Sequence, residues 1–181
     1  MEVHDADVHL GTLDPVSVSR DGTEVSIGRF LPSQFVKDQK RNFGPLVLLE
    51  TTAFLTENFQ GLQAVRYVLN REIEMHGDGM QVAGARSALL QAMGAEAVTI
   101  SPMPDSETPG NFVVRGIWAY NERNLEALRQ CLVREREVYR QWDPAHASNA
   151  AQPIPALRKR LRQLLARGPA DRGFRGGETA D

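Results

Sequence analysis

The chain has 181 residues and a formal net charge of −2, and 41% of its residues are hydrophobic and 24% charged. These proportions are typical of a globular protein with one sizeable core. The net charge of −2 excludes a general electrostatic attraction to nucleic acid or anionic lipid, so any such attraction must be local. The single cysteine excludes an internal disulfide framework and every metal site built from several cysteines.

Targeting signals are missing from the residue pattern. No apolar run reaches the length of a membrane span, and the acidic start MEVHDADVHLG is unlike a signal peptide. We therefore expect a cytoplasmic protein. The preference for Arg and Ala over Lys is associated with GC-rich bacterial genomes and indicates a bacterial source.

The first 14 residues contain four acids and no Lys or Arg. Such a segment is typical of a mobile arm, unless Val8 and Leu10 add an edge strand to a sheet. The arm also holds side chains of metal-ligating type, namely His4, Asp5, Asp7 and His9. A mobile arm offers no preformed ligand geometry, so we expect no metal and no cofactor.

Residues 16–30 predict a β-hairpin. Asp21-Gly22 favours a tight turn, which would pair Val18 with Val25 and Val16 with Ile27. These aliphatic residues then share one face, so only that face is expected to be buried.

Four helices and a strand are predicted next. Ser33 is expected to cap a short helix over 33–41, and helices over 61–77 and 80–93 follow from their apolar spacing. Residues 46–59 predict a helix from their length and from Pro45, which suits a helix start, although Val47 and several threonines would also suit a strand. Residues 96–101 predict a strand.

Residues 111–142 carry both tryptophans and combine a strand with a long helix. Over 111–119 both alternating sets are largely apolar, which is typical of a strand covered on both faces or awaiting a partner. Asn121 is a candidate N-cap of a helix ending at Trp142, whose apolar stripe faces inward and whose charged face is expected to be solvated.

The composition changes after Trp142. Residues 143–155 are rich in Pro and Ala and predict a linker, 156–167 predict a basic amphipathic helix, and 168–181 predict a disordered tail. The helix combines a leucine stripe with five positive charges, at Arg158, Lys159, Arg160, Arg162 and Arg167.

The predicted fold class is therefore α+β. We expect one domain over 1–142, with an antiparallel sheet of about four short strands (16–20, 24–30, 96–101 and 111–119) packed on helices, and the basic helix beyond a linker.

Three functions remain open from the sequence. The first is a non-catalytic protein–protein interaction, as an adaptor, a chaperone-like factor or an accessory subunit, through self-association or another protein. Its candidate contact residues are aromatic and leucine side chains: Trp118, Tyr139, Trp142, Leu157, Leu161 and Leu164.

The second function is nucleic-acid binding, in which the five basic residues of 156–167 contact phosphates. The third is a small-molecule enzyme with an unrecognised pocket. The sequence shows no catalytic constellation, because Cys131 lies mid-helix and no nucleophile motif occurs. It therefore favours a protein without enzymatic activity.

Overall fold

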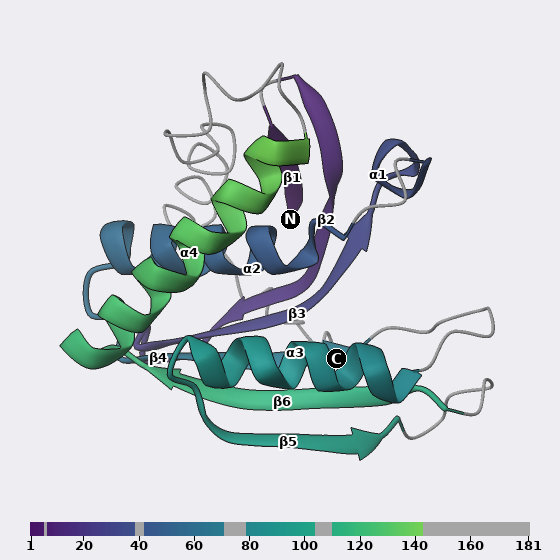
Figure 1. Cartoon of the computed structure of the whole chain (residues 1–181). Coiled ribbons are helices and arrows are strands. Elements are labelled where there is room, and N and C mark those ends of the chain that lie inside the picture. Colours follow the sequence, from purple (N-terminus) through teal and green to yellow (C-terminus); the bar gives the residue numbers. More distant parts are fainter. Residues whose placement is uncertain (6, 39–41, 71–78, 104–109, 143–181) are drawn as a thin grey trace, which may run out of the picture.

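The computed structural model describes residues 1–5, 7–38, 42–70, 79–103 and 110–142. This part of the chain forms an α+β fold with a six-stranded mixed sheet in the order β1-β2-β3-β4-β6-β5 (Figure 1). The strands are β1 Glu2–Asp5, β2 Val8–Val18, β3 Glu24–Pro32, β4 Ala64–Asn70, β5 Glu96–Pro102 and β6 Phe112–Ala119. The helices are α1 Gln34–Asp38, α2 Gly44–Asn58, α3 Gly79–Ala92 and α4 Glu122–Trp142.

The α+β class is confirmed, but the sheet is larger than the predicted four strands and is not wholly antiparallel. Strands β3 and β4 pair in parallel, while the other neighbours are antiparallel. The chain runs from β3 through α2 into β4, and such a crossover is what a parallel pair requires. The basic helix predicted for 156–167 lies outside the described residues.

The β2–β3 hairpin has the predicted register, with Val16 opposite Ile27 and Val18 opposite Val25. Its turn is longer than the predicted two-residue loop, because the Ser19 amide donates to the Glu24 carbonyl at 2.9 Å. The Asp21 carboxylate holds this turn by accepting from the Ser19 hydroxyl at 2.6 Å and from the Thr23 amide at 3.2 Å.

The N-terminal segment is paired into the sheet. Strand β2 includes Val8 and Leu10, as in the edge-strand alternative to a mobile arm, and β1 pairs with it at the sheet edge. Leu10 and Val3 are buried in the core, so this pairing removes apolar surface from water.

The helix predicted for 61–77 is wrong over its described part, which forms strand β4 at Ala64–Asn70. Val65, Tyr67 and Leu69 are buried, while Arg66 and Val68 between them are exposed. This is the period of two expected for a strand. Residues 62, 65 and 69 also have helical spacing, so the pattern alone was ambiguous.

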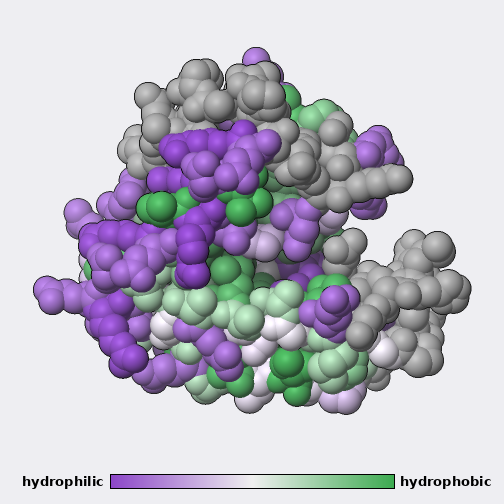
Figure 2. Space-filling view, in the orientation of Figure 1, coloured by the Kyte–Doolittle hydropathy of each residue, from purple (hydrophilic) through white to green (hydrophobic). Residues whose placement is uncertain are grey.

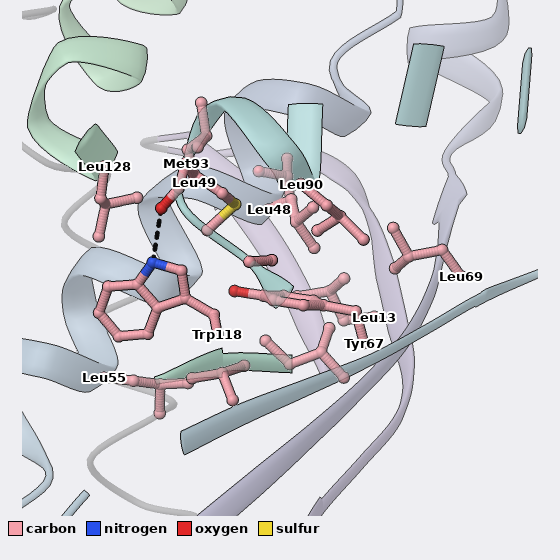
Figure 3. Packing of buried hydrophobic residues seen from close by; sticks show 14 of the residues in the cluster. Leu13, Leu48, Leu49, Leu55, Tyr67, Leu69, Leu90, Met93, Trp118 and Leu128 are labelled. Atoms are coloured by element: carbon pink, nitrogen blue, oxygen red, sulfur yellow. Dashed lines mark hydrogen bonds between the residues drawn. The ribbon is translucent and has the colours of Figure 1, made fainter. Parts of the chain in front are cut away.

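The helices α2, α3 and α4 lie over one face of the sheet (Figure 1). The helix over 46–59 is thereby established as α2, and the helices over 80–93 and 122–142 are confirmed. The core beneath them is centred on the fully buried Trp118 of β6, whose indole nitrogen donates to the Met93 carbonyl at 2.8 Å (Figure 3). Leu55 of α2 and Leu128 of α4 are drawn beside this ring.

A basic pocket between three helices

A cavity of about 650 Å³ opens where β3, α1, the first turn of α2 and one side of α3 meet. Most of its lining is apolar: Leu13, Phe30, Val36, Phe43, Leu48, Leu69, Val82 and Leu89. The other side chains with functional groups are Arg29, Lys37, Asn42, Gln81 and Arg86. We refer to this cavity as the basic pocket.

The apolar wall of the basic pocket is continuous with the protein core. Leu13, Leu48 and Leu69 line the cavity and also belong to the buried cluster around Tyr67 (Figure 3). Each comes from a different element, β2, α2 and β4 respectively. Since these side chains are fixed by packing on several sides, the wall is preformed rather than assembled by a ligand.

Three positive charges line the pocket, and they come from three separate elements. Arg29 extends from β3, Lys37 from α1 and Arg86 from α3. No Asp or Glu is among the described lining residues. The described lining residues therefore carry three positively charged side chains and no negatively charged one.

Two of these cations have no protein partner within the described part of the chain. The side chains of Arg29 and Lys37 form no hydrogen bond or ion pair there, although Asp14 lies opposite Arg29 in the β2–β3 register. Arg86 does have a partner, because its Nη1 atom donates a hydrogen bond to the Leu69 carbonyl at 3.4 Å. Arg29 and Lys37 are thus the two lining cations most available to a ligand.

The first turn of α2 also borders the pocket. Its N-cap residue Phe43 has no side-chain hydrogen bond to the helix, and the Gly44 amide donates to the Asn42 side-chain oxygen at 3.2 Å. Pro45 follows and has no amide hydrogen. A helix start carries a partial positive charge, so it adds to the field of the three side chains.

Phe43 connects the pocket to α4. It lines the cavity, and its ring makes an edge contact with Tyr139 at a centroid distance of 5.7 Å. The Tyr139 hydroxyl donates to the Asp5 carboxylate at 2.5 Å, which ties the last turns of α4 to β1. The wall formed by Phe43 is therefore supported from behind.

A buried ion pair fixes α4 on α2. Arg136 donates to both carboxylate oxygens of Glu50, at 2.6 and 2.9 Å, and Glu50 is 4% exposed. The hydrogen bond to Glu50 raises the pKa of Arg136 above its ordinary value. A bidentate arginine–carboxylate pair also fixes orientation, so it sets how α4 crosses α2.

The aromatic residues predicted to contact a partner lie in different environments in the structure. Trp118 has no exposed surface and packs in the core rather than at an interface, because its strand is covered by α3 and α4. Tyr139 is half-buried between Phe43 and Asp5, and Trp142 is the last residue of α4. Because Trp118 is buried, it does not form an exposed patch with Tyr139.

The remaining predicted residues lie outside the described part of the chain. They are Leu157, Leu161 and Leu164, and the proposed phosphate contacts Arg158, Lys159, Arg160, Arg162 and Arg167. The charged face of α4 is described, and Glu126, Arg129, Arg134 and Glu137 are exposed on it. Figure 2 shows this hydrophilic surface (purple) following the course of α4 above the paler surface of α3.

The sequence did not indicate the basic pocket. Arg29, Lys37 and Arg86 belong to three separately predicted elements, and no spacing along the chain connects them. Pro45 was predicted only as a helix start, and no binding role was attached to it. The three cations line one cavity because β3 and β4 pair in parallel, and the sequence did not predict that pairing.

The described residues contain no group of three or more His, Cys, Asp or Glu side chains that could hold a metal ion. Within the same residues, no helix is both long and apolar enough to cross a membrane. The fold and the site define an α+β protein with a preformed, basic, largely apolar pocket. Comparisons with protein-family models, with curated proteins and with solved structures find no match to this chain.

Proposed function

We propose that this protein binds a small organic anion with an apolar body in the basic pocket. The observation that carries the proposal is the lining itself: cations from β3, α1 and α3 stand over a largely apolar wall with no acidic side chain among the described lining residues. A cavity of about 650 Å³ is within the range of roughly 300–1,000 Å³ typical of small-molecule sites.

The apolar wall and the cations have separate effects on binding. Burial of an apolar ligand body contributes roughly 25 cal/mol per Å² of surface removed from water. Arg29 and Lys37 favour an acidic group, and they disfavour a neutral or cationic ligand because their charge would then stay uncompensated in a partly desolvated site. An amphipathic anion satisfies both parts of the lining.

The lining supports binding rather than acid–base or nucleophilic catalysis. Among the described lining residues there is no Asp, Glu, His, Cys, Ser, Thr or Tyr, the side chains that most often act as general acids, general bases or nucleophiles. A carrier, sensor or ligand-dependent adaptor is therefore the role that this lining favours.

Two alanines of α3 provide a matched test. Ala85 lines the pocket, whereas Ala88 does not, and both are exposed. Ala85→Trp should obstruct the cavity and weaken binding of the fluorescent apolar anion anilinonaphthalene sulfonate on the order of tenfold. Ala88→Trp should bind like the wild type. Equal affinity in all three proteins, each with unchanged circular dichroism, would show that the dye binds elsewhere and would reject the proposal.

The second candidate function is protein–protein interaction, in which the protein acts as an adaptor or accessory subunit in the cytoplasm. The observation that favours it is the sheet face opposite the helices, where Arg66, Val68 and Arg115 are exposed side by side on β4 and β6. Self-association through this face predicts that the mass measured by light scattering rises with concentration. A constant monomer mass would rule out that form of the interaction.

A further inference from the structure

We propose that His4 and His9 form a two-imidazole binding site for a divalent transition-metal cation, with a preference for Cu²⁺ over Ni²⁺. The site lies on strands β1 and β2, and β1 is an edge strand of the sheet (Figure 1). Neither histidine lines the basic pocket, so this inference is independent of the proposed function.

The pairing of β1 with β2 gives the two histidines a fixed geometry, which a mobile N-terminal arm would not have provided. His4 lies directly opposite His9 in the antiparallel register, and the next pair toward the turn is Asp5 with Val8. The two ring centroids are 5.0 Å apart. Imidazoles that share one metal ion through nitrogens about 2.0–2.1 Å from it have ring centres roughly 5 Å apart, so the observed spacing matches a shared ion.

Both imidazole rings lie on the face of the sheet away from the core. Val3, which precedes His4, and Leu10, which follows His9, are buried in the core. Successive side chains of a strand point to opposite faces, so the two histidines share the outer face. His9 is exposed and the side chain of His4 is 25% exposed, so a cation can reach both rings from water.

The hydrogen bonds of the two rings leave the same nitrogen of each ring free. The Nε2 atom of His9 lies 3.0 Å from the Gly11 carbonyl oxygen, and the Nε2 atom of His4 lies 3.4 Å from a Glu2 carboxylate oxygen. These oxygens only accept, so Nε2 carries the proton, and a neutral ring then has its lone pair on Nδ1. Neither Nδ1 atom has a partner in the described part of the chain. Histidine ligands of metals are held in this way, with the second ring nitrogen bonded to a carbonyl or carboxylate oxygen.

The number of protein ligands decides the class of metal. The described residues provide no group of three or more His, Cys, Asp or Glu ligands, so they do not form a closed tetrahedral zinc site. Two imidazole nitrogens with water in the other positions suit the tetragonal coordination of Cu²⁺ and Ni²⁺, and Cu²⁺ has the higher affinity for such ligands. The Glu2 carboxylate beside His4 adds a negative charge that favours a bound cation.

Titration of the full chain, without an affinity tag, with CuCl₂ and with NiCl₂ at pH 7.5 tests the proposal. We expect one tightly bound Cu²⁺ ion, with weaker binding of Ni²⁺, and an electron paramagnetic resonance spectrum that shows coupling of the copper to two nitrogens. His4→Asn and His9→Asn should each weaken Cu²⁺ binding on the order of tenfold or more, because loss of either ring ends chelation.

The chain has two other histidines, His76 and His146, and they supply matched controls. His76→Asn and His146→Asn remove the same type of ligand and should leave the Cu²⁺ affinity and the spectrum unchanged. A bound ion also joins β1 to β2, so Ni²⁺ should raise the melting temperature of the wild type and of both controls but not that of His4→Asn or His9→Asn. Each variant is compared with itself with and without metal, so a substitution that lowers stability on its own does not obscure the result.

Three results would overturn the proposal. They are unchanged Cu²⁺ affinity in His4→Asn and His9→Asn, coupling to a single nitrogen in the wild type, and loss of the affinity in either control variant. None of them bears on the basic pocket, which is tested separately by dye binding to Ala85→Trp.

Discussion

Two neighbouring threonines of α2 are fully buried, but their hydroxyl groups differ in hydrogen bonding. Thr52 donates to the Leu48 carbonyl and contacts the Tyr67 hydroxyl, both at 2.8 Å. The Thr51 hydroxyl has no partner among the described residues. A buried hydroxyl without a partner has lost its bonds to water and received none in return, which costs about 1–3 kcal/mol. Thr51 is thus a local source of instability in an otherwise satisfied core.

The two threonines predict opposite effects of the same substitution. Thr51→Val keeps the shape of the side chain and removes the unpaired hydroxyl, so the free energy of unfolding should rise by about 1 kcal/mol. Thr52→Val removes two hydrogen bonds and takes away the Thr52 partner of the Tyr67 hydroxyl. The free energy of unfolding should therefore fall by about 1–3 kcal/mol. Urea unfolding at pH 7 measures both, and a loss of equal size in the two variants would contradict the assignment.

The Tyr67 hydroxyl also predicts how stability changes at alkaline pH. Burial raises the pKa of Tyr67 above its ordinary value of 10, because the phenolate would be desolvated. The unfolded chain therefore releases this proton at a lower pH than the folded chain does. The stabilisation is complete below pH 10 and is lost as the pH rises above 10.

Replacement of Tyr67 by Phe tests that dependence. Tyr67→Phe should lose about 1 kcal/mol at pH 7, through its bond to Thr52, but should lose less additional stability between pH 9.5 and 11 than the wild type. Tyr120→Phe removes an exposed tyrosine and should leave the alkaline profile unchanged. Identical profiles for Tyr67→Phe and the wild type would show that Tyr67 does not control this range.

At the scale of elements, the position of α4 depends on polar contacts as well as on leucine packing. The Glu50–Arg136 pair joins α2 to α4, and the Tyr139–Asp5 bond joins α4 to β1. At the other end of α4, the buried Asn124 donates from its side-chain amide to the Ala119 carbonyl at 2.9 Å. These contacts are spread along the helix, so α4 is fixed at several points rather than by one seam.

Removal of one charge from the buried pair should be costly. Glu50→Gln leaves Arg136 with its positive charge and without its hydrogen-bonded carboxylate, and we expect the free energy of unfolding to fall by about 2 kcal/mol, since the Arg136 side chain is 25% exposed and partly hydrated. Glu126→Gln breaks the exposed pair with Arg129, at 3.6 Å, and should cost less than about 0.5 kcal/mol. Similar losses in urea unfolding would show that the buried pair has no special effect.

At the scale of the whole molecule, the sequence predicted what depends on near neighbours. The hairpin register, the α2 start at Gly44-Pro45 and the amphipathic α4 follow from turn chemistry and periodicity. Strand β4 was mistaken for a helix, because seven residues with apolar positions at 65 and 69 satisfy either period. What decides between them is the pairing with β3 and β6, which are distant along the chain.

The basic pocket was unpredictable for the same reason. Arg29, Lys37 and Arg86 line one cavity only because the β3–α2–β4 crossover brings the start of α2 and the side of α3 to the same place. Each cation taken singly has the residue type and spacing of an ordinary solvated side chain. What distinguishes them is that they line one cavity, and a linear pattern does not contain that information.

The position of β4 between β3 and β6 has a consequence for synthesis of the chain. While the ribosome is still making residues before Phe112, β4 can bond to β3 on one side but has no strand on the other. Its backbone groups and the apolar side chains of Val65, Tyr67 and Leu69 are then open to other nascent chains. The N-terminal half is therefore not a separable folding unit, and a fragment that ends before β6 will aggregate where the complete chain folds.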